Sequence, residues 1–293
     1  MVLGYSEKNE NAIDLFIFFQ NVFKNGEKCY NTLGIVTEVI IMHAVKVRNL
    51  IIKEGMPALC VPLCAATPDA LRNEAGKAAV SADMLEWRMD HYEEASADAL
   101  GKGALVIRET IGELPLLATF RTAEEGGCRS ISSSDYHALY AALIERKACD
   151  LIDLELTQEE PVIRALIAMA HDAGIKVVIS SHDFAKTPSL EAMTGRLRRM
   201  QQLGADIAKL AVMPQDELDV LRLLEASVRA HRCLDVPLIT MAMGALGTIS
   251  RLGGETFHSA VTFASMGKGS APGQLEAAPA RAALQLLHEA RER

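Results

Sequence analysis

Short apolar runs alternate with amphipathic segments along most of this chain. From about residue 45, strand-like runs begin at intervals of roughly 22 to 36 residues, with helix-like segments between them. This spacing is typical of a repeated strand–helix unit, which places successive strands parallel in one sheet. The eight runs cover residues 58–64, 84–89, 116–121, 151–156, 177–181, 207–213, 238–243 and 260–265.

A further run over residues 45–52 reads as a strand, with a turn at residues 54–57, and predicts a leading β-hairpin. Eight strand–helix units are the number that closes a barrel, and 293 residues suit one such domain. We therefore predict an α/β fold, a (β/α)8 TIM barrel with an N-terminal β-hairpin closing the bottom of the barrel. A doubly wound open sheet is the alternative, but no glycine-rich dinucleotide fingerprint follows any strand.

The segment after residue 186 carries a clear helix-start signal. Thr187 is predicted to be the N-cap and Pro188 the first helical residue, and apolar residues then recur at helical spacing. Gly204 suits the end of this helix. Other helices are predicted over residues 138–147, 162–173, 218–231 and 278–291.

One lysine interrupts an otherwise apolar strand. Lys209 lies within the run 207–213, and His182 directly follows the preceding run. Parallel neighbouring strands bring both side chains to the same end of the sheet. Burial favours the neutral amine, which is the nucleophile that attacks a ketone to form a Schiff base. The alternative is a lysine at a strand end whose ammonium reaches water.

Polar side chains gather at one end of the predicted strands, after the apolar part of each. In a barrel this is the C-terminal face, where such enzymes hold their active sites. A structural polar layer inside the barrel is the alternative for some of them. The set comprises Glu86, Arg88, Asp90, Thr119, Arg121, Asp153, Glu155, His182, Asp183 and Lys209.

Composition narrows the class of protein. The formal net charge of −8 argues against a nucleic-acid partner, although a locally basic site could still bind an anionic substrate. The six cysteines show no paired metal-binding spacing, so a reducing compartment is expected. No apolar run is long enough to span a membrane, and no signal peptide is recognised, so we expect a cytoplasmic protein.

Residues 1–42 differ in composition from the rest of the chain. They contain Phe16, Phe18, Phe19 and Phe23, four of the eight phenylalanines. We expect an N-terminal extension of unknown role over residues 1–42 and one compact domain over residues 43–293.

Seven stretches, in order along the chain and on the expected strand ends, resemble type I 3-dehydroquinate dehydratase. The resemblance runs from about Val45 to the C-terminus. One motif alone would be weak evidence, but seven in order are specific. They are Glu86-Trp-Arg-Met-Asp90, Thr119-Phe-Arg-Thr-Ala-Glu-Glu-Gly-Gly127, Ile152-Asp-Leu-Glu155, Ser181-His-Asp-Phe184, Ala205-Asp-Ile-Ala-Lys209-Leu-Ala-Val-Met-Pro214, Gly247-Thr-Ile-Ser-Arg251 and Ser270-Ala-Pro-Gly-Gln274.

The resemblance implies a lyase that dehydrates 3-dehydroquinate to 3-dehydroshikimate in the shikimate pathway. Lys209 would condense with the ketone, His182 would act as base and acid, and Glu125 would orient that histidine. No metal and no organic cofactor is implied, because the lysine itself supplies the electron sink. The resemblance also suggests a homodimer.

The resemblance also implies substrate-binding roles for the residues at matching positions of this chain. Arg251 is expected to hold the substrate carboxylate, because a planar guanidinium can donate two parallel hydrogen bonds. Ser270 and Gln274, on a loop after the eighth strand, are expected to close over the substrate. The other expected contacts are Glu86, Arg88 and Arg121 to the ring hydroxyls, with Met243 and Phe257 as apolar walls; Glu155 is expected to be structural.

Two other functions are considered. A class I aldolase on the same barrel would also use a lysine imine, and a phosphate site after the last two strands would favour it. Gly253-Gly254 is a weak candidate for that site. A non-catalytic ligand-binding barrel would usually lose its nucleophile or base, whereas Lys209, His182 and Arg251 are all present here.

Overall fold

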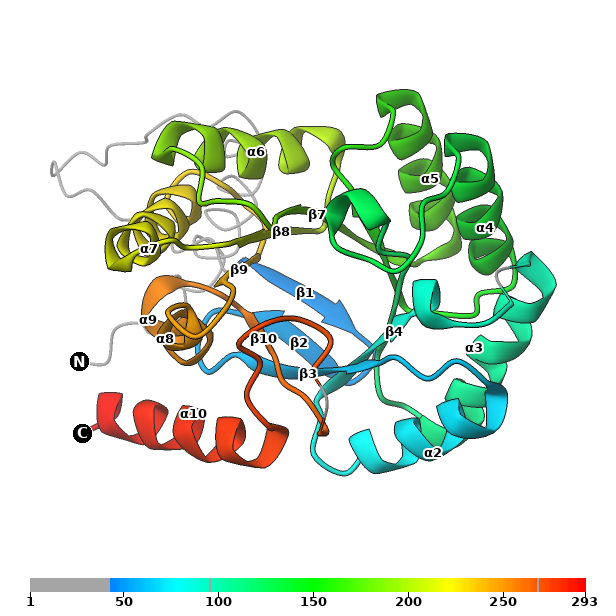
Figure 1. Ribbon diagram of the computed structural model, residues 1–293, viewed down its shortest axis with the longest axis horizontal. Helices are drawn as coiled ribbons and strands as arrows, with labels where there is room; N and C mark the ends of the chain where they lie inside the picture. The colour runs from blue at the N-terminus through cyan, green and yellow to red at the C-terminus, as the bar shows by residue number, and fades with distance from the viewer. Residues whose placement is uncertain (1–42, 95, 268) are drawn as a thin grey trace, which may run out of the picture. The chain divides into compact units, whose positions relative to one another are not determined.

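The computed structural model describes residues 43–94, 96–267 and 269–293 (Figure 1). Residues 1–42, which form the predicted extension, lie outside the described residues. Eight parallel strands form one sheet in the order β10-β3-β4-β5-β6-β7-β8-β9. A parallel bridge between Leu238 and Ser259 joins the two sides of the remaining gap, so the barrel is nearly closed. The predicted TIM barrel is confirmed.

Each predicted run coincides with one strand of the barrel, with shifts only at its ends. The strands are β3 (Ala58–Leu63), β4 (Met84–Arg88), β5 (Leu116–Thr119), β6 (Leu151–Glu155), β7 (Lys176–Asp183), β8 (Ile207–Val212), β9 (Leu238–Ala242) and β10 (Val261–Phe263). His182 therefore lies inside β7 and not just past it.

Helices connect the strands and cover the outside of the barrel (Figure 1). None of the described helices combines the length and apolar composition that a membrane span requires. They are α2 (Pro68–Ala78), α3 (Ala97–Ile111), α4 (Ser133–Glu145), α5 (Glu160–Ala173), α6 (Leu190–Leu203), α7 (Glu217–His231), α8 (Thr248–Leu252), α9 (Gly254–Phe257) and α10 (Ala277–Arg291), with short 3-10 turns η2 (Met89–His91) and η3 (Ala123–Glu125).

The start of α6 differs from the prediction. Thr187 is not the N-cap; Ser189 is, and its Oγ accepts a hydrogen bond from the backbone N–H of Ala192 at 3.2 Å. Both residues carry a hydroxyl near Pro188, and the sequence alone does not separate them. The end of the helix is as predicted, because Gly204 is the C-cap with a φ of 106°.

The N-terminal hairpin consists of β1 (Ala44–Val47) and β2 (Leu50–Lys53). The prediction of one strand over residues 45–52 is wrong, because the chain turns at Arg48 and Asn49, with Val47 paired to Leu50. Arg48 adopts a φ of 51° there. No glycine marks this turn, so the alternation of side chains reads as continuous.

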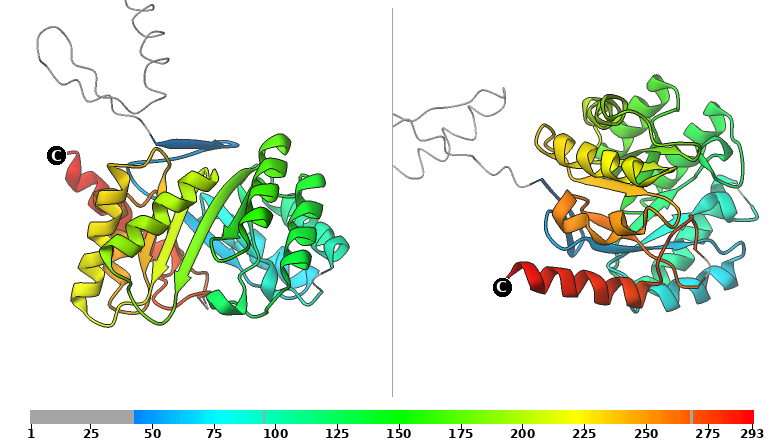
Figure 2. Two further views of the ribbon diagram at one scale, coloured as in Figure 1. Left: turned by 90° about the horizontal axis from the view of Figure 1, so that it is seen from above. Right: turned by 60° about the vertical axis from the view of Figure 1, so that its left-hand side comes forward.

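The hairpin plugs the end of the barrel at which the strands begin (Figure 2, left). Val45, Val47 and Ile52 are buried in one apolar cluster with residues from the starts of the strands, including Leu151 and Ile207. A second, larger cluster fills the space between the sheet and the helices. The interior of the barrel at this end is therefore apolar.

Strand alternation decides which side chains face the interior. In β8, Ile207 and Ala211 belong to the interior cluster, whereas Ala208 and Leu210 face the helices. Lys209 lies between these outward residues and therefore points inward.

We propose that residues 43–293 form a self-sufficient domain, because the hairpin, the barrel strands and their covering helices all lie within it. A chain that begins at Met42 is expected to unfold within about 4 °C of the full chain, the shift that about 1 kcal/mol produces in a domain of this size. Thermal unfolding followed by circular dichroism measures this. Insolubility, or a much lower midpoint, would show that residues 1–42 stabilise the barrel.

Candidate active site

One pocket at the C-terminal ends of the strands brings together every polar residue predicted for catalysis or substrate binding. Residues far apart in the sequence meet there because parallel strands end on the same face of the barrel. The predicted residues that line it are Glu86, Arg88, Arg121, Glu125, His182, Lys209, Arg251, Ser270 and Gln274.

Lys209 lies at the floor of this pocket and is only 3% exposed. Its Nζ donates to Asp153 Oδ2 at 2.9 Å and to Glu86 Oε1 at 3.3 Å. The Phe263 ring centroid lies 4.5 Å from the same nitrogen. Lys209 is therefore surrounded by two kinds of group: the apolar residues of its strand and two carboxylates. The carboxylates stabilise the ammonium against the effect of burial.

Asp153, on β6, links Lys209 to a second cation. Arg121 Nη2 lies 2.9 Å from Asp153 Oδ2, and the Ser180 hydroxyl donates to Oδ1. Burial alone would raise the pKa of Asp153, but the charges of Arg121 and Lys209 outweigh it and hold the pKa below its usual range. Asp153 is therefore an anion that positions the lysine.

Arg121 is surrounded by acceptors. Besides Asp153, its Nη1 donates to Glu155 Oε1 at 2.9 Å and to Ser180 Oγ at 3.0 Å. Glu155 also accepts from the backbone N–H and the hydroxyl of Thr122, at 2.9 and 2.8 Å. These contacts agree with a structural role for Glu155. A contact from Arg121 to a substrate hydroxyl stays a prediction.

His182 is held by Glu125, which lies on the 3-10 turn after β5. Glu125 Oε2 lies 3.0 Å from the backbone nitrogen of His182 and 2.9 Å from its ring Nδ1. Thr157 donates to the other carboxylate oxygen at 2.9 Å. Because a carboxylate accepts hydrogen bonds, we assign the ring proton to Nδ1, which leaves Nε2 free to accept a proton.

Burial shifts both members of this pair toward their neutral forms. It lowers the pKa of His182 well below its usual value, and the charges of Arg121 and Lys209 lower it further. It also raises the pKa of Glu125 to about 7, although Arg121 opposes that rise. A neutral imidazole near neutral pH is suited to act as a base.

A close approach next to Glu125 requires glycine. Gly126 ends the turn with a φ of 83°, and a Cβ there would lie 2.3 Å from the Phe184 ring. A larger residue would displace the aromatic ring or the turn, and with it the carboxylate that holds His182.

The pocket's arginines differ in their partners. Arg88 forms a two-pronged ion pair with Asp90, at 2.8 and 2.7 Å. Arg251 contacts the carbonyl of Pro272 at 3.1 Å, and no carboxylate of a described residue lies within ion-pair distance of it. Its buried Nε has no hydrogen-bond partner within the described part of the chain. Burial lowers the pKa of Arg251 to about 10. Arg251 therefore offers an uncompensated positive charge to an anion.

The loop after β10 lies at the edge of the pocket. Gln274 Oε1 accepts from the backbone N–H of Ser270 at 2.8 Å, and its Nε2 donates to Ser270 Oγ at 3.1 Å. The two predicted lid residues thus hold each other across a short turn. Closure over a substrate stays a prediction.

The type I 3-dehydroquinase family model matches residues 59–291 of this chain, which include all of these site residues. The chain belongs to the type I 3-dehydroquinase family. A 3-dehydroquinate dehydratase of Syntrophotalea carbinolica is 49% identical over 251 residues, covering 84% of this chain and 99% of that protein. One from Salmonella paratyphi B is 44% identical over 252 residues, covering 85% and 100%.

Solved structures of the family share the barrel. A type I 3-dehydroquinate dehydratase from Clostridium difficile, solved with covalently modified comenic acid, superposes with a TM-score of 0.82 at 41% identity. The match covers 85% of this chain and 99% of that one. The enzyme from Geobacillus kaustophilus gives the same TM-score at 38% identity, covering 85% and 98%. This chain is therefore an enzyme with the type I 3-dehydroquinase barrel.

Sequence reasoning missed several residues of this type I 3-dehydroquinase pocket. Phe257 does not line it, so its expected role as a wall is wrong, whereas Met243 does line it. The sequence marks Asp153 as a strand-end charge but does not show that it contacts Lys209; its two-residue spacing from Glu155 is the signal for an inward side chain. The walls that were not predicted are Phe184, Met241 and Phe263.

Asp153→Asn is expected to lower the free energy of unfolding at pH 7 by about 3–5 kcal/mol, because it leaves two buried cations short of an anion. The folded-state pKa of Asp153 is lowered, so its contribution is present above its ordinary value of 3.8 and is lost as pH falls below that value. The difference from wild type should therefore shrink below about pH 4.

Urea unfolding at pH 7 and at pH 3 measures both effects. Asp172→Asn, at an exposed position on α5, is the matched control and should change stability by no more than about 0.5 kcal/mol. Equal stability of Asp153→Asn and wild type at pH 7 would contradict the proposed charge balance.

Proposed function

We propose that this enzyme dehydrates 3-dehydroquinate to 3-dehydroshikimate through an imine on Lys209, the third step of the shikimate pathway. The observation that carries the proposal is one pocket holding a buried lysine, a carboxylate-bound histidine and an arginine with no carboxylate partner among the described residues. Assembly as a homodimer and a cytoplasmic location stay predictions.

The lysine environment suits imine formation. Lys209 must lose a proton before it attacks the C3 ketone, and Asp153 and Glu86 are within hydrogen-bond reach of its nitrogen. Loss of water from the resulting carbinolamine leaves a positively charged iminium at the place of the ammonium. The same two carboxylates stabilise that charge without having to reorganise.

His182 fits the proton transfers that follow. The iminium draws electrons from the adjacent C2–H bond, so a neutral imidazole can remove that proton and leave an enamine. The enamine then expels the C1 hydroxyl, which takes a proton from the imidazolium and departs as water. Glu125, within 2.9 Å of the ring, stabilises the imidazolium between these steps. Hydrolysis of the imine frees Lys209.

Arg251 supplies the anchor for the substrate carboxylate. Arg88 is already paired with Asp90, and Arg121 with several carboxylates, whereas the polar contacts of Arg251 to described residues are to a backbone carbonyl and a methionine sulfur. A substrate carboxylate would both neutralise this arginine and satisfy its open donors.

The class I aldolase alternative has less support. The glycines proposed for its phosphate site do not line the pocket. Gly254 instead packs closely on the hairpin side, where a Cβ would lie 2.6 Å from Pro57. Its small size is thus required for packing. Retention of Lys209 and His182 in one pocket argues equally against a non-catalytic barrel.

Borohydride reduction in the presence of 3-dehydroquinate is expected to attach the substrate carbons to the peptide that contains Lys209. Peptide mass mapping detects the adduct. Lys209→Met should abolish it, whereas the matched Lys176→Met, which removes a lysine paired with Asp206 at the start of β7, should not. Labelling at Lys176 or Lys186 would overturn the assignment.

His182→Ala is expected to keep some imine formation while turnover falls by about 10²–10⁴-fold, the usual contribution of a general acid–base group. Trapping and steady-state kinetics on the same preparation separate the two steps. His171→Ala, which removes a half-exposed histidine on α5, is the control. Near-wild-type turnover of His182→Ala would move the proton transfers to another group.

Arg251→Ala is expected to raise KM and lower kcat together, because a lost anchor weakens binding and also misplaces the reacting carbons. Arg251→Lys should recover only part of the loss, since an ammonium cannot make the two-pronged contact. Steady-state kinetics with 3-dehydroquinate measure both. Unchanged constants would transfer the carboxylate site to Arg88 or Arg121.

A further inference from the structure

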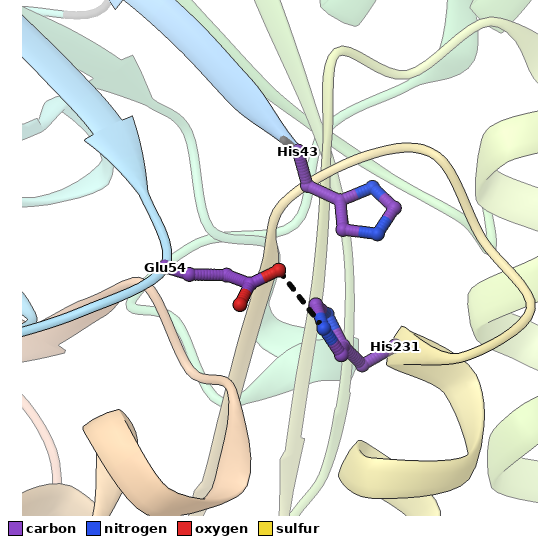
Figure 3. A group of neighbouring side chains, drawn as sticks. All are labelled: His43, Glu54 and His231. Carbon is purple, nitrogen blue, oxygen red and sulfur yellow. Dashed lines mark ion pairs between the residues drawn. The ribbon is translucent and has the colours of Figure 1, made fainter. Parts of the chain in front are cut away.

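Three metal-ligand side chains converge at the base of the barrel, at the opposite end from the active site (Figure 3). His43 immediately precedes β1, Glu54 immediately follows β2, and His231 is the last residue of α7. One ligand atom from each residue lies within 4.8 Å of the others. The cluster thus joins both ends of the hairpin to a helix of the barrel wall.

Two of these groups already lie at the separation expected for neighbouring ligands of one ion. His231 Nε2 is 3.0 Å from Glu54 Oε1. Zinc–ligand distances of about 2.0–2.1 Å in a tetrahedral site place ligand atoms about 3.3 Å apart. The His43 ring lies beside this pair, edge-on to His231 with centroids 4.8 Å apart (Figure 3). A rotation of the His43 side chain would complete a three-ligand set.

The cluster contains an unsatisfied buried group. His43 is only 8% exposed, and its Nδ1 has no hydrogen-bond partner among the described residues. A buried polar nitrogen without a partner is destabilising, and a cation coordinated by Nδ1 itself would supply that partner. His258 stacks on His231, with centroids 3.8 Å apart and planes 6° apart, which fixes the orientation of that ring.

Two groups place negative charge beside the cluster, and Arg232 places an opposing positive charge near it. Glu54 adds one negative charge. The last turn of α7 also presents the negative end of the helix dipole at His231.

We propose that His43, Glu54 and His231 bind a divalent transition-metal ion of the zinc class, which clamps the hairpin to the end of α7. Two imidazoles and one carboxylate are a ligand set that such ions accept, with a remaining position for water. The site is structural, because the catalytic pocket lies at the other end of the strands. Metal binding is thus expected to change stability and not turnover.

Zinc titration of the full chain after chelator treatment tests the proposal. A second cluster, Asp90, His91 and Cys128, could also take metal, so the measurements use a Cys128→Ser background. Calorimetry should give one bound zinc. Zinc at about 100 times its Kd should raise the midpoint of thermal unfolding by about 5–10 °C. Cobalt substitution should give visible absorption typical of a low-coordinate nitrogen and oxygen site.

His231→Gln and His43→Gln, each tested separately, should weaken zinc binding by more than about tenfold and remove the rise in unfolding midpoint, since even outer-shell changes cost about 10–100-fold in affinity. His171→Gln is the control, because it removes a histidine that contacts a single carboxylate of the described residues, Asp206, at 2.9 Å. Turnover of 3-dehydroquinate reports that each variant is folded. If a histidine variant does not fold, Glu54→Gln, at a partly exposed side chain, serves in its place.

Failure of the Cys128→Ser chain to bind one zinc, or equal zinc affinity and equal thermal shift in the variants and the control, would overturn the proposal. Loss of both in the variants alone supports it.

Discussion

The compensation of buried charge by Asp153 is the interaction on which the active end of this barrel depends. Asp153 contacts both Arg121 and Lys209, and all three are almost entirely enclosed. Burying an unpaired charge is strongly unfavourable, so each of these groups is tolerated because the others are present. The same arrangement leaves Lys209 pointing into the pocket, and leaves Arg251 as the arginine there without a carboxylate partner among the described residues.

The interior of the barrel is apolar where the strands begin and polar where they end. The hairpin supplies Val45, Val47 and Ile52 to an apolar plug where the strands begin. Side chains alternate between the two faces of a strand. Because Ile207 points into the barrel, Lys209, two residues later, points into it as well. Pairing of Ser180 with Lys209 in the β7–β8 ladder then places His182, two residues on, at the same mouth.

The sequence predicts the barrel well because strand–helix periodicity records which faces are buried. The sequence does not decide between two neighbouring residues that suit the same position: Ser189 and Thr187 could each be the N-cap of α6. It also does not mark the turn at Arg48, which contains no glycine. The sequence pattern says even less about which side chains contact each buried charged group. Apolar strand residues indicate that Lys209 is buried, but only the folded barrel shows that Asp153 and Glu86 contact it. Motif resemblance selected residues that meet in one pocket, whereas their pairing depends on tertiary structure.

We propose that Lys209 and Arg251 together fix the substrate in the pocket. A crystal structure of the borohydride-reduced adduct with 3-dehydroquinate tests it most directly. The account predicts a covalent bond from Lys209 Nζ to C3, the carboxylate on the Arg251 guanidinium, and His182 Nε2 within hydrogen-bond reach of C2. A carboxylate bound to Arg88, or a covalent bond to another residue, would contradict it.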